Sequence, residues 1–111
     1  MKKLYFENTH IDYIGNGENK FRIYVAFKDD PQLKVIGYLD YSTVDTDLYV
    51  DMIEVVDKYR GQGIGKELYR RLFDINSDMN FMKAGYYTEA GSHIRKWFER
   101  EILNNHNLEM V

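Results

Sequence analysis

The stretch that decides the fold reads DMIEVVDKYRGQGIGKELYRRL and runs from Asp51 to Leu72. Its first part is apolar like a strand, its middle is rich in glycine, and its last part has the spacing of a helix. Three glycines, Gly61, Gly63 and Gly65, fall within five residues. Because a glycine loses more backbone entropy on folding than other residues, this spacing indicates that the turn requires residues without a side chain.

A strand pattern precedes the glycines and a helix pattern follows them. Residues 48–56 are apolar enough to form a central strand. Within residues 64–76, four apolar side chains recur at helical spacing and predict an amphipathic helix: Ile64, Leu68, Leu72 and Ile75. A glycine-rich turn in this position usually points free amide N–H groups and the positive end of the helix dipole at an anion. The alternative is a loop whose glycines only make a tight turn.

Two well-known phosphate-binding loops do not fit this turn. The dinucleotide pattern G-x-G-x-x-G matches Gly61 and Gly63, but its third glycine would fall on Lys66. The P-loop pattern needs a glycine where Arg60 stands and a serine or threonine where Glu67 stands. Neither pattern therefore explains the loop.

The rest of the chain predicts an α+β fold. Four strands are expected in an antiparallel meander, at residues 4–15, 21–28, 34–42 and 48–56. After the helix at 64–76 we expect a strand at 81–88 and a second helix at 92–103. The strand at 81–88 follows a helix, so it most simply joins the sheet parallel to 48–56 through a right-handed crossover. Residues 15–20 leave room only for a turn between the first two strands.

Composition bounds the class of protein. A chain of 111 residues predicts one domain spanning 1–111. It has no cysteine, which excludes disulfides, cysteine-based metal sites and a thiol nucleophile, and no metal site is predicted. A net charge of −3 gives no general attraction to nucleic acid, and no apolar run reaches the length of a membrane span. The lack of cysteine fits a reducing cytoplasm, which is the expected location.

The segment YRGQGIG resembles the acyl-CoA loop of the GNAT superfamily of acyl-CoA-dependent N-acetyltransferases. The motif of that family is Arg or Gln, two residues, Gly, one residue, then Gly or Ala, and Arg60, Gly63 and Gly65 match it. The strand before the loop, the helix after it and the preceding meander also agree, so the resemblance covers about residues 21–100. It implies a GNAT-like mixed sheet in which the two helices common between the first and second strands are missing.

The resemblance also implies a ligand, acetyl-CoA. The loop amides would hold the diphosphate, with Arg60 and Lys66 adding positive charge or standing as plain surface cations. The loop residues implied are Gly61, Gln62, Gly63, Ile64, Gly65 and Lys66. The pantetheine arm would pair like an added strand with the main chain of Ile53, Val55 and Val56.

Such enzymes let an amine attack the thioester directly, so a group must remove the proton from the ammonium. Two carboxylates, Asp51 and Glu54, lie in the implied strand. They are three residues apart and point to opposite faces of a regular strand, unless a bulge intervenes. We favour Glu54 as the base or water-orienting group, with Asp51 as the second candidate and a surface carboxylate as the alternative for each. A backbone amide near Val55 would stabilise the developing oxyanion.

The last helix departs from the family pattern. Relatives often carry an asparagine at its start and a tyrosine within it that can protonate the thiolate, and the alignment puts Gly91 and Phe98 at these positions. Phe98 shares a helix face with Trp97 and is expected in the core. Four side chains nearby in sequence could supply a hydroxyl or an imidazole: Tyr86, Tyr87, Ser92 and His93.

The sequence therefore predicts an N-acetyltransferase that moves an acetyl group from acetyl-CoA to a primary amine of unknown identity. One alternative is a catalytically weak acyl-CoA-binding or protein-interaction module on the same fold, which Phe98 and the missing helices favour. Another is an unrelated α+β interaction domain. Because no helices follow the first strand, a bare region of sheet is expected, and with it a homodimer.

Overall fold

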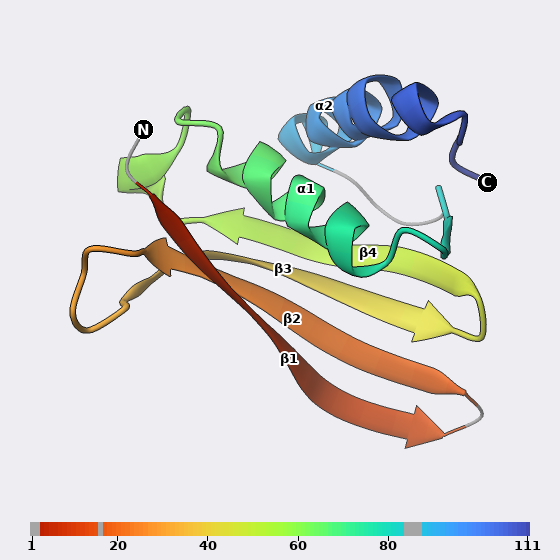
Figure 1. The fold of residues 1–111 in the computed structure, drawn as a ribbon, viewed down its shortest axis with the longest axis horizontal. Helices are drawn as coiled ribbons and strands as arrows, with labels where there is room; N and C mark the ends of the chain where they lie inside the picture. Colours follow the sequence, from red (N-terminus) through yellow and green to blue (C-terminus); the bar gives the residue numbers. More distant parts are fainter. Residues whose placement is uncertain (1–2, 16, 84–87) are drawn as a thin grey trace.

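A computed structural model describes residues 3–15, 17–83 and 88–111 (Figure 1). The strands are β1 (Leu4–Gly15), β2 (Glu18–Phe27), β3 (Val35–Val44), β4 (Asp47–Val55) and β5 (Asn80–Phe81). The α-helices are α1 (Ile64–Ile75) and α2 (Glu89–Phe98). Short turns of 3-10 helix lie at Asp57–Tyr59 and Asn104–His106, and a π-helical turn, Glu99–Leu103, extends α2.

The five strands form one sheet in the order β1-β2-β3-β4-β5. The first four pair antiparallel, and β5 then pairs parallel to β4, with Asp47 opposite Asn80 and Leu48 opposite Phe81. The predicted GNAT-like α+β fold, with its meander and parallel last strand, is thus confirmed. β1 ends at Gly15 and β2 begins at Glu18, so no helix fits between them, and residues 18–20 belong to β2 rather than to the predicted turn.

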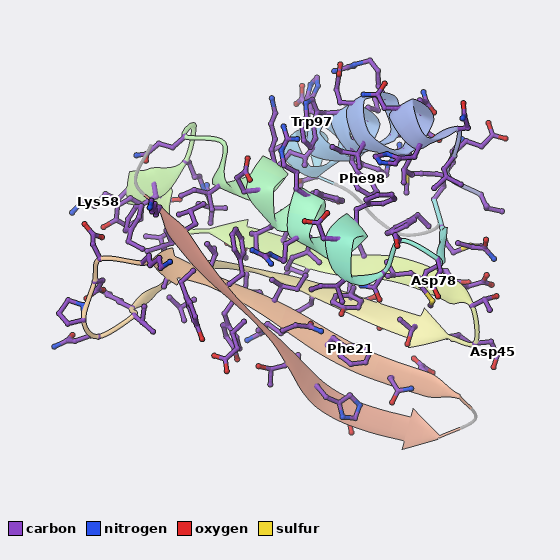
Figure 2. All side chains as sticks on the ribbon, in the orientation of Figure 1. Phe21, Asp45, Lys58, Asp78, Trp97 and Phe98 are labelled. Atoms are coloured by element: carbon purple, nitrogen blue, oxygen red, sulfur yellow. The ribbon has the colours of Figure 1, made fainter. Side chains whose placement is uncertain are left out.

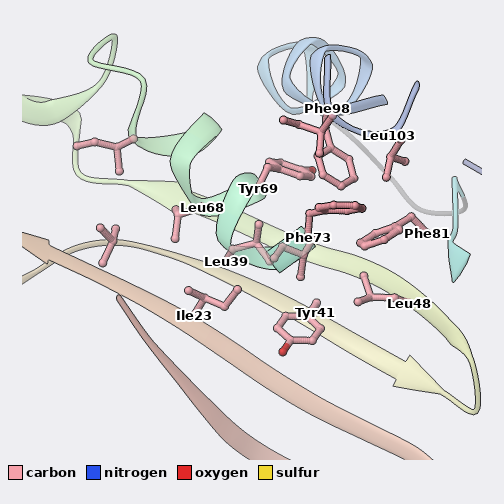
Figure 3. Packing of buried hydrophobic residues seen from close by; sticks show 14 of the residues in the cluster. Ile23, Leu39, Tyr41, Leu48, Leu68, Tyr69, Phe73, Phe81, Phe98 and Leu103 are labelled. Carbon is pink, nitrogen blue, oxygen red and sulfur yellow. The ribbon is translucent and has the colours of Figure 1, made fainter. Parts of the chain in front are cut away.

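Both helices lie on the same side of the sheet (Figure 1). Alternation along β2 turns Ile23 and Val25 toward the helices, and both side chains are fully buried. α1 packs on β2, β3 and β4, and α2 packs on α1. The core lies between these layers and includes Leu39 and Leu48 from the sheet and Leu68 from α1, with Leu68 near Leu39 and Leu48 near Phe81 (Figure 3).

Four predicted elements, β2, β3, β4 and α1, differ from the observed bounds by one to three residues at an end, and two others differ more. The strand expected at 81–88 is described as a strand only at Asn80–Phe81, and Tyr86 and Tyr87 lie outside the described residues. The helix expected at 92–103 begins at Glu89, because Thr88 caps it with Oγ1 accepting from the Gly91 amide at 3.0 Å. Its predicted second half is the π-helical turn rather than α-helix.

The opposite face of the sheet, which we call the helix-free face, carries Arg22, Asp40 and Tyr38 among its side chains. All described side chains are drawn on the ribbon in Figure 2. Arg22 donates to both carboxylate oxygens of Asp40, at 2.6 and 2.9 Å, and its guanidinium lies 4.0 Å from the ring centroid of Tyr38. These residues come from β2 and β3, so they tie the centre of the meander together. Among the described residues, no helix has the length and apolarity needed to cross a membrane.

Candidate active site

The glycine-rich loop ends β4 and starts α1. Gly61 and Gly63 both have φ of 80°, the left-handed region that side chains disfavour. Gly63 is the N-cap residue of α1 and makes no side-chain cap, so no side chain of that residue covers the amides of the first turn. A Cβ on Gly61 would have no heavy atom within 4 Å. Uncapped amides beside open space are a suitable environment for an anion.

Gly65 has a different purpose from the other two glycines. A Cβ at this position would lie 3.2 Å from Cδ1 of Ile94 and 3.6 Å from Cδ1 of Ile53. Ile94 belongs to α2 and Ile53 to β4, so the bare Cα lets the first turn of α1 pack closely against both. The glycine spacing therefore combines a backbone turn with a close approach of three elements.

The two cations of the loop already have partners within the protein. Arg60 donates from Nε to the carbonyl oxygen of Val55 at 2.9 Å, and its other nitrogens lie 2.9 Å from Asp57 and 3.7 Å from Glu54. Nζ of Lys66 lies 5.1 Å from the ring centroid of Trp97 on α2. Arg60 thus fastens the loop to the end of β4, and Lys66 is directed toward α2. Gln62 is exposed.

β4 has an open edge beyond its short pairing with β5. The amide of Val56 donates to Ile36 beside β3 at 2.9 Å, whereas the carbonyl of Val55 accepts from Arg60 and so points away from β3. Main-chain direction alternates along a strand, so Ile53 points the same way as Val55. Among the described residues, β5 covers only Asp47 and Leu48 on this edge. The edge is therefore suited to an extended ligand that pairs like a strand.

A cavity of about 190 Å³ lies along this edge. It is bounded by β4, by α1 and by the start of α2. The residues around it are Val50, Asp51, Met52, Ile53, Glu54, Tyr69, Thr88 and Gly91. The structure thus brings together the predicted Asp51, Glu54 and Ile53, and adds Tyr69 and Thr88, which the sequence analysis did not identify.

A β-bulge changes the relation of the two carboxylates. Asp40 pairs with Met52, but the next residue of β3, Tyr41, pairs with Val50, so Asp51 is the extra residue of β4. Glu54 lies opposite Tyr38, and Oδ2 of Asp51 accepts from Ser42 Oγ at 2.5 Å.

Tyr38 and Ser42 are four residues apart on β3 and therefore share one face of the sheet. Because Glu54 pairs with the first and Asp51 is bonded to the second, both carboxylates lie toward the helix-free face. The exception allowed for in the prediction is therefore present: a bulge intervenes, and the two carboxylates do not point to opposite faces.

Gly91 and Phe98, which align with the asparagine and the tyrosine of relatives, lie in different places relative to the cavity. Gly91 is buried and borders the cavity. Phe98 is fully buried, as expected, but does not border the cavity; its ring packs on Tyr69 with centroids 4.9 Å apart. Ser92 is half-buried and His93 is exposed. In the part of the chain that the structure describes, no cluster of three or more metal-binding side chains occurs.

Three features are thus contiguous: uncapped amides at the start of α1, an unpaired edge on β4, and a cavity with two carboxylates. The first fits a phosphate group, the second an extended chain, and the third a reaction that removes a proton from an amine. The three features form one continuous path from the loop along β4 to the cavity.

Comparisons with known proteins agree with this geometry. A family model described as the acetyltransferase (GNAT) family matches residues 2–98. A solved structure, a putative acetyltransferase from the GNAT family of Bacteroides thetaiotaomicron, is similar with a TM-score of 0.51 and 23% identity over 80% of this chain. The match spans 47% of that structure's chain, so this sequence covers about half of its length. A search of curated proteins finds no match. Since the family model spans most of the sequence, the chain belongs to the acetyltransferase (GNAT) family.

Proposed function

We propose that this protein transfers an acetyl group from acetyl-CoA to a primary amine. The observation that carries the proposal is the continuity of the site. The uncapped start of α1 leads to the open edge of β4, and that edge leads to the cavity beside Asp51 and Glu54. One extended acyl-CoA molecule can occupy all three in order.

Binding would depend mainly on the backbone. The amides of residues 61–66 would hold the diphosphate, because left-handed glycines and a side-chain-free N-cap leave room for its approach. The main chain of Ile53 and Val55 would pair with the pantetheine arm, whereas the predicted contact with Val56 is wrong because its amide already donates to Ile36 beside β3. Arg60 would then exchange part of its contact with Asp57 for the phosphate, and Lys66 would add charge at longer range.

In the reaction, the amine would attack the thioester directly. The protein would remove a proton from the amine and stabilise the negative charge that develops on the thioester oxygen. The carboxylate of Glu54 takes the proton from the amine, directly or through a water molecule. Asp51, oriented by Ser42, supports the cationic amine as it arrives. Backbone N–H groups on the open edge near Val55 stabilise the thioester oxygen as it gains charge. The amine nitrogen then bonds to the acetyl carbon while the carbon–sulfur bond breaks.

Coenzyme A binding is the first test. At 100 times its dissociation constant, a ligand raises the free energy of unfolding by about 2.7 kcal/mol, which is readily seen as a thermal shift. ADP is a matched control that offers a diphosphate without the pantetheine arm, and it is expected to bind much more weakly. No shift with coenzyme A would contradict the proposal and leave a domain whose glycines only turn the chain.

Acetyl transfer is the second test. Purified protein with acetyl-CoA and a panel of small amines, polyamines and peptides should release free thiol together with an acetylated amine, found by mass spectrometry. Binding of coenzyme A without transfer to any amine would instead support an acyl-CoA-binding module. Phe98, which has no hydroxyl to offer, is the residue that favours this second outcome.

A further inference from the structure

Four side chains form a row across the helix-free face, one from each strand of the meander. Glu54 of β4 lies opposite Tyr38 of β3, and Tyr38 lies opposite Tyr24 of β2. Tyr24 in turn lies opposite Glu7 of β1. The neighbours of Tyr24 along β2 are buried under the helices, so Tyr24 and its cross-strand partners point away from them. The row thus has a carboxylate at each end and two phenol rings between them.

Each end of the row borders a cavity. Glu54 borders the first cavity, where an amine is acetylated in the proposed function, on which this inference rests. Glu7 and Tyr24 border a second cavity of about 190 Å³, whose other walls come from β1, β2 and the chain leading into β3. Neighbouring strands lie about 4.8 Å apart, so the Cα atoms of the two carboxylates are separated by about 14 Å.

Both carboxylates of the row have room for a new cationic partner. Glu7 is exposed and has no hydrogen-bond or ionic partner among the residues that the structure describes. Glu54 has only the contact with Arg60, at 3.7 Å. An ionised carboxylate accepts hydrogen bonds and donates none, so an ammonium group is the suitable partner at each end.

The middle of the row is aromatic and close to neutral. Tyr24 and Tyr38 are both half-buried, and the hydroxyl of Tyr38 donates to Sδ of Met52 at 3.6 Å, so its oxygen can still accept. The guanidinium of Arg22 lies 5.7 Å from the ring centroid of Tyr24 and 4.0 Å from that of Tyr38. Its charge is matched by the bidentate bond to Asp40, so it leaves little net positive charge beside the row.

We propose that the acceptor is a linear polyamine that lies along this row, with the reacting amine at Glu54 and the far ammonium group at Glu7. The terminal charges match the two carboxylates, and the methylene and inner ammonium groups match the phenol rings. An extended tetraamine such as spermine spans about the length of the row, whereas the diamine putrescine is much too short.

The transfer itself is that of the proposed function. The nitrogen at Glu54 gives its proton to the carboxylate and bonds to the acetyl carbon. The carbon–sulfur bond breaks with its electron pair on sulfur, and the thiolate takes a proton from solvent. The product is a singly acetylated polyamine that keeps its far ammonium group.

The first part of the test compares three acceptors through kcat/KM. Putrescine has two amines but cannot reach from Glu54 to Glu7, and aminododecanol is as long as spermine but has a hydroxyl in place of the second amine. Dilute enzyme is used, so that self-association through the same face does not compete. After correction for the number of terminal amines, we expect kcat/KM for spermine to exceed both others by at least about fivefold, the upper range for one exposed ion pair.

The second part compares Glu7→Lys with Asp12→Lys. Asp12 is an exposed acid on the same strand and lies opposite Lys20, away from the row, so it is a matched control for the change in surface charge. Glu7→Lys should lower kcat/KM for spermine by about fivefold to tenfold, because a repulsion replaces an attraction. It should leave the dissociation constant of coenzyme A and kcat/KM for butylamine near wild type. Asp12→Lys should change none of these quantities by more than about twofold.

Three results would overturn the inference, each in a different way. Equal kcat/KM values for the three acceptors would show that neither length nor the second charge is recognised. Equal losses in the two lysine variants would mean that spermine responds to the overall charge of the surface rather than to Glu7. Failure of the wild-type protein to acetylate any amine would overturn the proposed function, and the polyamine acceptor with it.

Discussion

Arg22 shows how a single side chain stabilises the helix-free face. Its bidentate bond to Asp40 raises the pKa of the guanidinium above its usual range, so the side chain stays charged at all relevant pH values. Arg22→Lys keeps the charge but loses the second hydrogen bond and the flat contact with Tyr38. We expect a loss of about 1 kcal/mol in the free energy of unfolding. Urea denaturation measures it, and an unchanged midpoint would contradict it.

The two carboxylates of the site should differ in their effect on rate. Asp51 is already bound to Ser42, whereas Glu54 is half-exposed and has only a long contact with Arg60. We therefore expect Glu54→Gln to lower kcat by about 100-fold and Asp51→Asn to lower it by less than about 10-fold. Ser42→Ala should match Asp51→Asn if the serine acts by orienting that carboxylate. Steady-state kinetics with one amine decides between them, and the reverse order would make Asp51 the base.

At the scale of elements, the loop should bind its ligand through its backbone. Gly63→Ala forces a side chain into a left-handed conformation that costs roughly 1–2 kcal/mol, so the first-turn amides of α1 move. We expect it to weaken coenzyme A binding by at least about fivefold. Lys66→Ala should have a smaller effect, because Nζ is directed toward Trp97. Isothermal titration calorimetry tests the order, and a larger loss from Lys66→Ala would indicate a basic patch instead.

The start of α2 can be tested through its cap. Thr88→Ala removes the oxygen that accepts from the Gly91 amide and should cost about 1 kcal/mol of stability. Thr88→Ser keeps the oxygen and is the matched control. Thermal unfolding should show a lower midpoint for the alanine variant alone. Equal midpoints for the two variants would mean that this cap contributes nothing to the fold.

Regular elements could be predicted from the sequence because their signals are local. The alternation in β2 and the helical spacing from Ile64 to Ile75 each extend over many residues, and both elements are present, although β2 begins at Glu18, three residues before its predicted start. The start of α2 was missed by three residues, because the apolar pattern begins only at Ile94 and the cap at Thr88 precedes it. Helical spacing also did not distinguish α-helix from the π-helical turn that follows Phe98.

The site was only partly predictable, since its missing parts depend on contacts between distant residues. The motif located the loop and the strand, but the bulge at Asp51 arises from the register of β3 against β4. Tyr69 looks like an ordinary core residue of α1, and only the packing of α2 places it beside the carboxylates. Tyr69 lies four residues after Gly65 and therefore on the same side of α1, and this spacing is the one local indication of its position in the site.

At the scale of the whole molecule, the helix-free face is the surface through which we expect the protein to self-associate. Tyr5, Leu33 and Val35 are about two-fifths exposed, and with Tyr24 and Ala26 they surround a second cavity of about 190 Å³. Homodimer formation stays a prediction, and this face is where we expect it. Sedimentation equilibrium at high protein concentration measures the association, and Val35→Lys should weaken it. A monomer at all concentrations would exclude this prediction.

In the proposed reaction, the same face would determine which amines reach the site. β1 ends at Gly15 and β2 begins at Glu18, so among the described residues no helix stands in front of Glu54 or the half-exposed Met52. An amine carried on a peptide can therefore enter without meeting a wall, and its neighbouring residues can contact this surface.

Because such remote contacts lower the barrier when they persist in the transition state, we expect kcat/KM to be higher for a lysine within a peptide than for butylamine. Met52→Asp should reduce the rate with the peptide more than the rate with butylamine, since Met52 borders the cavity and only the peptide also extends over its exposed side chain. A discontinuous thiol-release assay with both acceptors measures the ratio. Equal kcat/KM values for the two, or an equal effect of Met52→Asp on both, would show that the acceptor makes no contact beyond its amine.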